Sequence, residues 1–207
     1  MSREESKAET RRLLLDAAEA VFHDQGYHGA SLAKVAAAAG FTKGAVYSTF
    51  TSKADLFLAV LDRRATARQA RLQAALEETT SAEDLLAAAA AAFSQFGDSV
   101  AGERSFWAAL IEFMVVVGDD EELQARFAAH HDASREAVAR SVQEWAARGD
   151  AILTVQPRAL ATAVMALNIG LTLEGLVAPA EVEAQSYVDA QLALLQGALK
   201  LGREKRG

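Results

Sequence analysis

The spacing of apolar residues is most regular between residues 31 and 53. Leu32 begins a stripe with helical spacing that continues at Val35, Ala36 and Ala39. Ser31 stands just before this stripe, where its hydroxyl can accept hydrogen bonds from free amides as an N-cap. Gly40 ends the helix, because glycine enters the left-handed region without a steric penalty, and Thr42 begins a second helix two residues later. Two short helices joined by a tight glycine turn predict a helix-turn-helix.

The second helix of the pair is predicted to have two different faces. Its inward face consists of Ala45, Val46, Thr49 and Phe50, and its outward face of Lys43, Gly44, Tyr47 and Ser48. A lysine can neutralise a phosphate and a tyrosine hydroxyl can donate to one, and most protein–DNA hydrogen bonds go to phosphates from such residues. The outward face therefore indicates DNA binding. The alternative is a generic pair of short helices with a solvated lysine.

The rest of the chain has helical periodicity throughout. Thr10 to His23 is expected to support the helix pair, after polar residues 1–8 that are expected to be disordered. Ser52 and Asp55 form a capping-box arrangement at the start of a long helix that continues past Arg71, with a solvated basic face that includes Arg63 and Arg64. Further helices are predicted over 85–96, 106–117, 121–148, 157–178 and 181–202. The predicted fold class is all-α.

The stretch from residue 17 to 56 closely resembles the DNA-binding domain of TetR-family transcriptional regulators. The shared elements, in order and at fixed spacing, are Gly26-Tyr27, Ser31, Ala36, Ala39-Gly40, Thr42, Gly44, Tyr47, Phe50 and Ser52-Lys53. The resemblance implies an N-terminal helix-turn-helix domain at 1–52, a connecting helix at 53–80 and a larger helical domain at 81–207. With the outward face, it predicts DNA contacts from Ser31, Thr42, Lys43, Gly44, Tyr47, Ser48, Thr49 and Lys53.

Composition adds to this prediction. The net charge of −7 is unevenly distributed, because residues 1–71 hold 11 basic and 8 acidic side chains whereas residues 72–207 hold 10 and 20. Such asymmetry is expected where one end of a chain meets a polyanion. The 207 residues include no cysteine, which excludes disulfides and thiolate metal sites and fits a reducing compartment. We also expect neither a signal peptide nor an apolar run long enough to span a membrane, and therefore a cytoplasmic protein.

The last two predicted helices suggest a dimer. Their apolar stripes consist of Leu160, Val164, Leu167 and Leu171 on one helix and Tyr187, Gln191, Leu194 and Ala198 on the other. Two such helices from each of two chains could form an intermolecular four-helix bundle, as the TetR resemblance implies. From the pattern alone, the same stripes could equally belong to the core of a monomer.

The larger domain contains polar and aromatic residues that suggest a ligand pocket. The candidates are Phe93, Phe96, Trp107, Glu112, Phe113, His130 and Asn168. Buried polar groups are costly unless they are paired, so each is either satisfied internally or available to a ligand. No phosphate loop, nucleophile elbow, zinc motif or Glu-x-x-His pair is present, so we expect no enzyme, cofactor or metal site. The prediction is a homodimeric repressor released from a near-palindromic operator by a small apolar or amphipathic ligand. The alternative is control by a protein partner.

Overall fold

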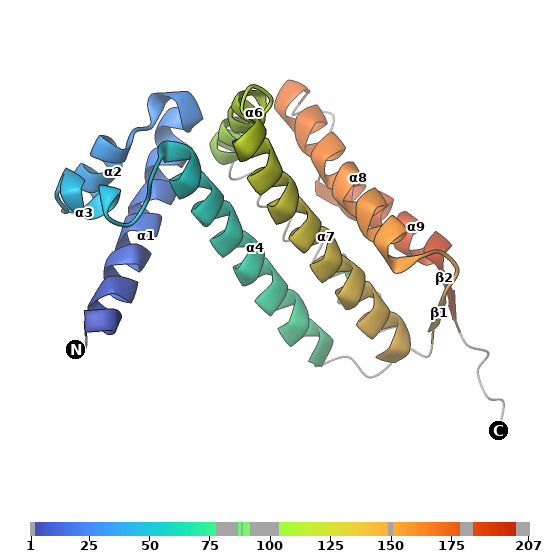
Figure 1. Cartoon of the computed structure of the whole chain (residues 1–207). Helices are drawn as coiled ribbons and strands as arrows, with labels where there is room; N and C mark the ends of the chain where they lie inside the picture. The colour runs from blue at the N-terminus through green and yellow to red at the C-terminus, as the bar shows by residue number, and fades with distance from the viewer. Residues whose placement is uncertain are drawn as a thin grey trace. The chain divides into compact units, whose positions relative to one another are not determined.

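The computed structural model describes residues 3–77, 87, 89–91, 104–148, 151–178 and 184–201. This part of the chain is helical apart from one small two-stranded sheet, which confirms the all-α fold class (Figure 1). The helices are α1 (Arg3–Gly29), α2 (Leu32–Ala38), α3 (Lys43–Tyr47), α4 (Lys53–Glu77), α6 (Arg104–Val117), α7 (Glu121–Arg148), α8 (Pro157–Val177) and α9 (Ala184–Ala198). The strands are β1 (Ala151–Leu153) and β2 (Leu199–Leu201), which pair antiparallel.

The chain divides into two compact units. The first comprises Met1–Thr66 and Glu103–His130, and the second comprises Ala67–Gly102 and His131–Gly207. Helices α4 and α7 each contribute residues to both units. The first unit therefore contains α1, α2 and α3 together with α6, which follows far later in the sequence. The functional boundaries at residues 52 and 80 stay a prediction.

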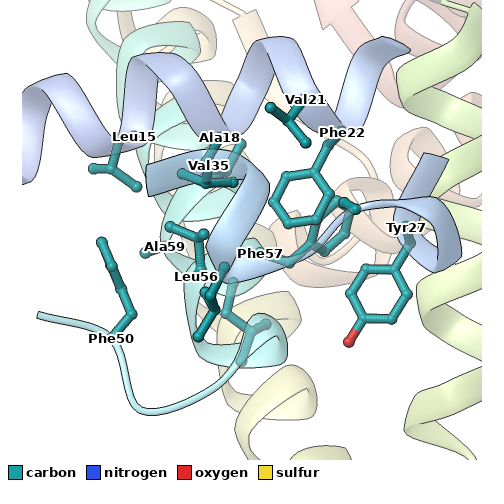
Figure 2. Packing of buried hydrophobic residues seen from close by; sticks show 14 of the residues in the cluster. Leu15, Ala18, Val21, Phe22, Tyr27, Val35, Phe50, Leu56, Phe57 and Ala59 are labelled. Atoms are coloured by element: carbon teal, nitrogen blue, oxygen red, sulfur yellow. The ribbon is translucent and has the colours of Figure 1, made fainter. Parts of the chain in front are cut away.

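The core of the first unit is built on aromatic side chains from three helices (Figure 2). Phe57 of α4 lies edge-on to Phe22 of α1, with ring centroids 4.7 Å apart, and contacts Phe113 of α6 at 4.8 Å. Tyr27 of α1 lies 5.3 Å from Phe57 and 5.1 Å from Phe113. Burial of large aromatic side chains dominates core energetics, and edge-to-face pairs add to it. Helix α6 is therefore part of the same core that supports α2 and α3.

Three predictions about secondary structure were wrong. The helix begins at Arg3, so the polar residues expected to be disordered extend α1. The last helix ends at Ala198, because the next three residues pair with β1. Helix α8 is long and apolar enough to cross a membrane by length and composition, contrary to the expectation that no such run exists. Of its most apolar 18-residue stretch, 22% is buried inside the chain. The predicted helix over 85–96 lies largely outside the described residues.

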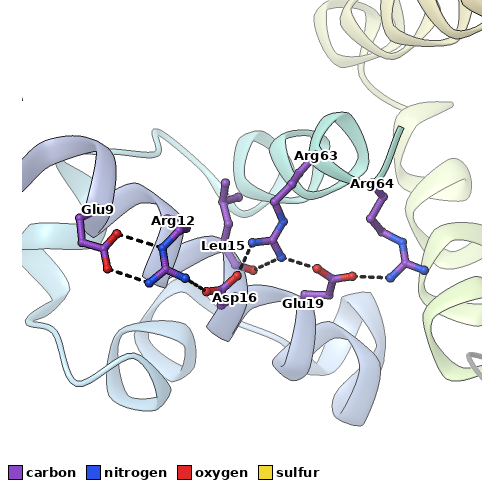
Figure 3. Close-up of polar contacts among 7 residues, drawn as sticks. All are labelled: Glu9, Arg12, Leu15, Asp16, Glu19, Arg63 and Arg64. Atoms are coloured by element: carbon purple, nitrogen blue, oxygen red, sulfur yellow. Dashed lines mark hydrogen bonds and ion pairs between the residues drawn. The ribbon is translucent and has the colours of Figure 1, made fainter. Parts of the chain in front are cut away.

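Ion pairs join α1 to α4 along one side of the first unit (Figure 3). Arg63 of α4 donates to Asp16 Oδ1 at 2.5 Å, to the Leu15 carbonyl at 3.1 Å and to Glu19. Arg64 also binds Glu19. The two arginines were predicted to form a solvated basic face, and this was wrong because acidic residues one turn apart on α1 lie opposite them.

Candidate nucleic-acid interface

Two side-chain caps define the helix-turn-helix. The Ser31 hydroxyl accepts from the Lys34 amide at 3.2 Å and begins α2, and the Thr42 hydroxyl accepts from the Ala45 amide at 3.3 Å and begins α3. Between them Gly40 has φ +71°, and no atom lies within 4 Å of a Cβ built there. The glycine is therefore required by the backbone conformation rather than by crowding. Both predicted caps and the turn residue have the geometry that the sequence indicated.

Helix α3 separates its faces as the periodicity predicts. Val46 and Phe50 are fully buried against the core, and Ala45 and Thr49 are half-buried. On the other side Lys43, Gly44 and Ser48 are exposed, and the Tyr47 side chain is 59% exposed. More than half of the Tyr47 side chain is therefore open to solvent and available to a partner.

The hydroxyl groups beside Tyr47 are bound within the helix. Ser48 Oγ donates to the Ala45 carbonyl at 2.8 Å, and Thr49 Oγ1 donates to the same carbonyl at 3.0 Å. Each hydroxyl oxygen can still accept a hydrogen bond. In contrast, Lys43 has neither an ion pair nor a hydrogen bond to any described residue. Lys43 is therefore the free cation of α3.

Lys53, the first residue of α4, is held in place by the chain itself. Its ammonium donates to the Tyr27 carbonyl at 2.7 Å and lies 4.3 Å from the centroid of the Tyr27 ring. Burial lowers the pKa of Lys53, and the charge of Glu112 opposes that shift. An ammonium has three donors, so this fixed charge retains capacity for a further acceptor. The predicted phosphate contact of Lys53 stays a prediction.

The capping box at the start of α4 is shifted by one residue from its predicted form. Ser52 Oγ accepts from the Asp55 amide at 3.0 Å, but the Asp55 carboxylate accepts from the Thr51 amide at 3.0 Å. The same carboxylate receives Arg126 of α7 at 2.6 Å. Burial opposes the charged form of Asp55, yet the bonds from Thr51 and Arg126 outweigh it and lower its pKa. Sequence spacing carried no signal for the contribution of Arg126.

The predicted pocket residues fall in both units. In the first unit, Trp107 is half-buried, Phe113 is a fully buried core residue, and Glu112 accepts from the His28 amide at 2.8 Å. His130 Nδ1, also in the first unit, lies 2.5 Å from Asp62 Oδ1. In the second unit, Asn168 accepts from Gln191. Phe93 and Phe96 lie outside the described residues, so the pocket stays a prediction.

The predicted dimer residues are divided between interior and surface of the second unit. Leu160, Val164 and Ala198 are buried in its core, and Gln191 is fully buried beside Asn168. Leu167, Leu171 and Leu194 are half-buried, and the side chain of Tyr187 is outside the described set. The exposed large apolar residues of α8 are instead Ile169, Leu173 and Val177, at 38%, 41% and 83% exposure. They recur four residues apart and so share one face of the helix.

Two family models together match most of the chain. The model of bacterial regulatory proteins of the tetR family matches residues 14–60, which include every element of the helix-turn-helix. The model of the C-terminal domain of BetI-type transcriptional repressors matches residues 81–200, more than half of the chain. This chain belongs to the TetR family of transcriptional regulators. The predicted family is confirmed, and its members are regulators rather than enzymes.

Known relatives agree with this assignment. The chain is 42% identical over 88 residues to the HTH-type transcriptional activator FasR of Mycolicibacterium smegmatis. That match covers 42% of this chain and 40% of FasR, so it spans well under half of the relative's length. The similarity between this chain and FasR is therefore limited to part of each protein.

Solved structures show the same fold over nearly the whole chain. A TetR-family transcriptional regulator from Mesorhizobium loti superposes with a TM-score of 0.69 at 19% identity and covers 95% of this chain and 96% of its own. The FadR regulator of Bacillus subtilis, solved in complex with stearoyl-CoA, gives a TM-score of 0.64 at 17% identity and covers 89% and 96%. At these identities the likeness establishes the fold of the regulator and nothing more.

Proposed function

We propose that this TetR-family regulator is a cytoplasmic homodimeric repressor that binds a near-palindromic operator and releases it when a small apolar or amphipathic ligand binds. The observation that carries the proposal is the outward face of α3. Lys43 and Tyr47 are exposed there, on a helix whose opposite face is fixed in the core by Val46 and, just beyond the end of the helix, by Phe50. A rigid helix that presents a free cation and an aromatic hydroxyl suits the backbone of duplex DNA.

The contact set that we propose is the predicted one. Lys43 and Tyr47 would bind phosphates directly, and Ser48 and Thr49, whose hydroxyls donate to the Ala45 carbonyl, would accept through their hydroxyl oxygens. Gly44 would let the DNA backbone approach closely, since a Cβ built at this residue meets only Thr42 Oγ1, at 3.8 Å. The complete proposed set is Ser31, Thr42, Lys43, Gly44, Tyr47, Ser48, Thr49 and Lys53.

The dimer is supported by the surface of α8. Ile169, Leu173 and Val177 form an exposed apolar stripe, and little of the helix is buried inside the chain. Burying such a stripe against its symmetry copy removes apolar surface from water at about 25 cal/mol per Å². We therefore propose that α8 and α9 of two protomers form a four-helix bundle, in which this stripe joins the predicted residues that are only half-buried within one chain, Leu167, Leu171 and Leu194. A symmetric dimer requires an operator with matching symmetry.

Ligand control is supported by a structural neighbour and by a buried amide in the second unit. FadR of Bacillus subtilis holds stearoyl-CoA, a long acyl chain with a polar end, in a protein of the same fold. The second unit of this chain contains a fully buried amide, Gln191, whose Oε1 has no hydrogen-bond partner among the described residues. A buried acceptor without a partner is costly and could be satisfied by a ligand donor. These observations favour a small ligand over a protein partner.

Selection from random duplexes tests the DNA-binding part of the proposal. The regulator should return an inverted repeat whose half-site centres lie about 34–36 Å apart or at a longer spacing that the dimer can reach. Light scattering should give twice the mass of the 22.0 kDa chain. A monomer in solution, or selected sequences without an inverted repeat, would contradict the proposal.

A thermal-shift screen followed by operator release tests the ligand part. Acyl-CoA thioesters, free fatty acids and apolar drugs form the probe set. A ligand that stabilises the regulator should weaken operator binding by roughly 5–150-fold, and operator DNA should weaken ligand binding by the same factor. Ligands that stabilise the protein without this reciprocal effect would contradict ligand control.

A further inference from the structure

Helix α1 is interrupted near its end by a glycine. Gly26 has φ +70° and ψ 179°, a conformation essentially restricted to glycine, and the helical turn that follows contains Tyr27, His28 and Gly29. A helical turn that restarts after a break has backbone amides without partners in the helix. The His28 amide finds one in Glu112 Oε2, which accepts it at 2.8 Å. Glu112 thus caps this turn from α6, 84 residues away in the sequence.

The carboxylate fits beside the turn because residue 26 has no side chain. A Cβ built on Gly26 would lie 3.0 Å from Glu112 Oε1 and 3.1 Å from Oε2. Real Cβ atoms rarely approach oxygen this closely, so any other residue would push the carboxylate away from the His28 amide. Gly26 is therefore required for two reasons: it adopts the positive-φ backbone conformation, and it leaves room for the Glu112 carboxylate.

Neighbouring groups hold the carboxylate and the turn together. Lys53 of α4 donates to the Tyr27 carbonyl, and its charge interacts with that of Glu112. The Tyr27 ring packs against Phe113, the residue that follows Glu112 on α6. Hydrogen bonds to a charged acceptor contribute more than neutral ones, so the Glu112 contact attaches the turn to α6. Residues from α1, α4 and α6 meet at this one turn.

The turn leads directly into the helix-turn-helix. Only Ala30 and Ser31 separate Gly29 from α2, and Lys34 of α2 donates back to the Gly29 carbonyl at 2.7 Å and to Gln25 at 2.6 Å. Because the connection is short and Lys34 forms two hydrogen bonds across it, α2 has little freedom to move independently of the turn. The position of α2 and α3 relative to α6 is consequently fixed where Glu112 binds.

We propose that Glu112 is a positioning residue for DNA binding, which holds the end of α1 on α6 and so fixes the direction in which each protomer presents α3. The inference rests on the proposed function, because direction matters most when two recognition helices must meet two half-sites together. It also gives Glu112 a role within the first unit instead of the ligand contact predicted from its sequence position.

A distance measurement within one chain tests the positioning step without DNA. The chain has no cysteine, so Ala38→Cys and Val115→Cys introduce two unique attachment points for spin labels on exposed residues of α2 and α6. Pulsed electron paramagnetic resonance should give a narrow distribution of label-to-label distances for the doubly labelled parent, and a broad or displaced distribution when Glu112→Ala is added. Glu112→Gln retains an oxygen acceptor for the His28 amide and should restore the narrow distribution. An unchanged distribution for Glu112→Ala would overturn the proposal.

Operator binding tests the consequence. Duplexes with two identical half-sites at several spacings are compared with a single half-site. Glu112→Ala should lose roughly tenfold in affinity, about 1.4 kcal/mol, at the preferred spacing and should discriminate less between spacings. Its affinity for a single half-site should stay equal to that of the parent. Equal losses on both kinds of duplex would indicate simple destabilisation and would overturn the proposal.

Val117→Ala is the matched control. Val117 is a buried residue of the same helix and core, and its truncation should lower the melting temperature without changing the distance distribution or the spacing preference. If the control broadens the distribution as much as Glu112→Ala does, the effect belongs to core stability and the proposal is wrong. If the parent selects no inverted repeat, the proposed function fails, while the distance measurement still decides whether Glu112 positions α2 and α3.

Discussion

Replacing Lys43 by alanine should flatten the salt dependence of operator binding. Lys43 is exposed and has no partner among the described residues, so its charge is available to a phosphate. Each neutralised phosphate contributes about 0.9 to the slope of log affinity against log salt on duplex DNA. A dimer carries two copies, so the variant should lose about 1.8 from the slope. Between about 50 and 200 mM salt, a fourfold change, the parent should therefore lose about 12-fold more affinity than the variant.

Fluorescence anisotropy with the selected operator at five or six salt concentrations measures both slopes. Lys43→Arg keeps the charge and should keep the slope. Lys200→Ala, at an exposed residue of β2, changes the net charge equally and should leave the slope unaltered because it removes no contact from α3. Parallel lines for the parent and Lys43→Ala would show that Lys43 binds no phosphate, whatever the change in affinity.

Three further substitutions test other parts of the structure. Tyr47→Phe should weaken operator binding and leave the melting temperature unchanged, because only an exposed hydroxyl is removed; an equally tight variant would contradict the phosphate contact. Phe57→Ala should lower the free energy of unfolding by about 3–5 kcal/mol in urea titrations, since the ring is fully buried among four other aromatic rings; a loss below about 1 kcal/mol would contradict that packing. Asp55→Asn should be less stable than the parent at neutral pH and much closer to it in acid. The folded protein lowers the pKa of Asp55 from 3.8, so the stability that this carboxylate contributes is lost as the pH falls through its folded pKa; a stability difference independent of pH would contradict this.

The local features of the helix-turn-helix could be predicted because each depends on residues close in sequence. A cap needs a hydroxyl three residues before an amide, as at Ser31 and Thr42, and a left-handed turn needs glycine, as at Gly40. The faces of α3 follow from a period of 3.6 residues. Short-range geometry therefore determined most of the predicted nucleic-acid interface, including which of its side chains are exposed.

Features that depend on distant residues were missed. Arg63 and Arg64 looked like a solvated face because their acidic partners lie on α1, more than 40 residues earlier in the sequence. The hydrogen bond that Glu112 accepts from the His28 amide, 84 residues earlier, also carried no signal in the sequence, and the prediction that Glu112 lines a pocket stays untested. The two three-residue strands could not be predicted, because so short a stretch has too little periodicity to be distinguished from the end of a helix. In each case the information lies in tertiary pairing.

Intramolecular partners also change what the charge asymmetry means. The basic excess of residues 1–71 suggested a broadly positive DNA-binding domain, but many of these basic side chains have hydrogen-bond or ion-pair partners within the chain. Those bound to carboxylates or carbonyls within the chain are Arg12, Lys34, Lys53, Arg63 and Arg64. Arg11 lies over the Phe50 ring, 4.8 Å from its centroid. Among the described side chains of the first 66 residues, Lys7 and Lys43 retain charges without such partners.

The salt dependence of the parent regulator should therefore be shallow. If Lys7, Lys43 and Lys53, whose carbonyl partner leaves its charge unneutralised, bind phosphates, a dimer makes six such contacts and the slope should be about 5.4. If all eight described basic side chains of this region did so, the slope would be about 14. The two values differ far beyond experimental error in an anisotropy titration at constant pH. A slope near the larger value would show that the ion pairs between α1 and α4 open when DNA binds, because Arg63 and Arg64 cannot neutralise a phosphate while Asp16 and Glu19 hold them.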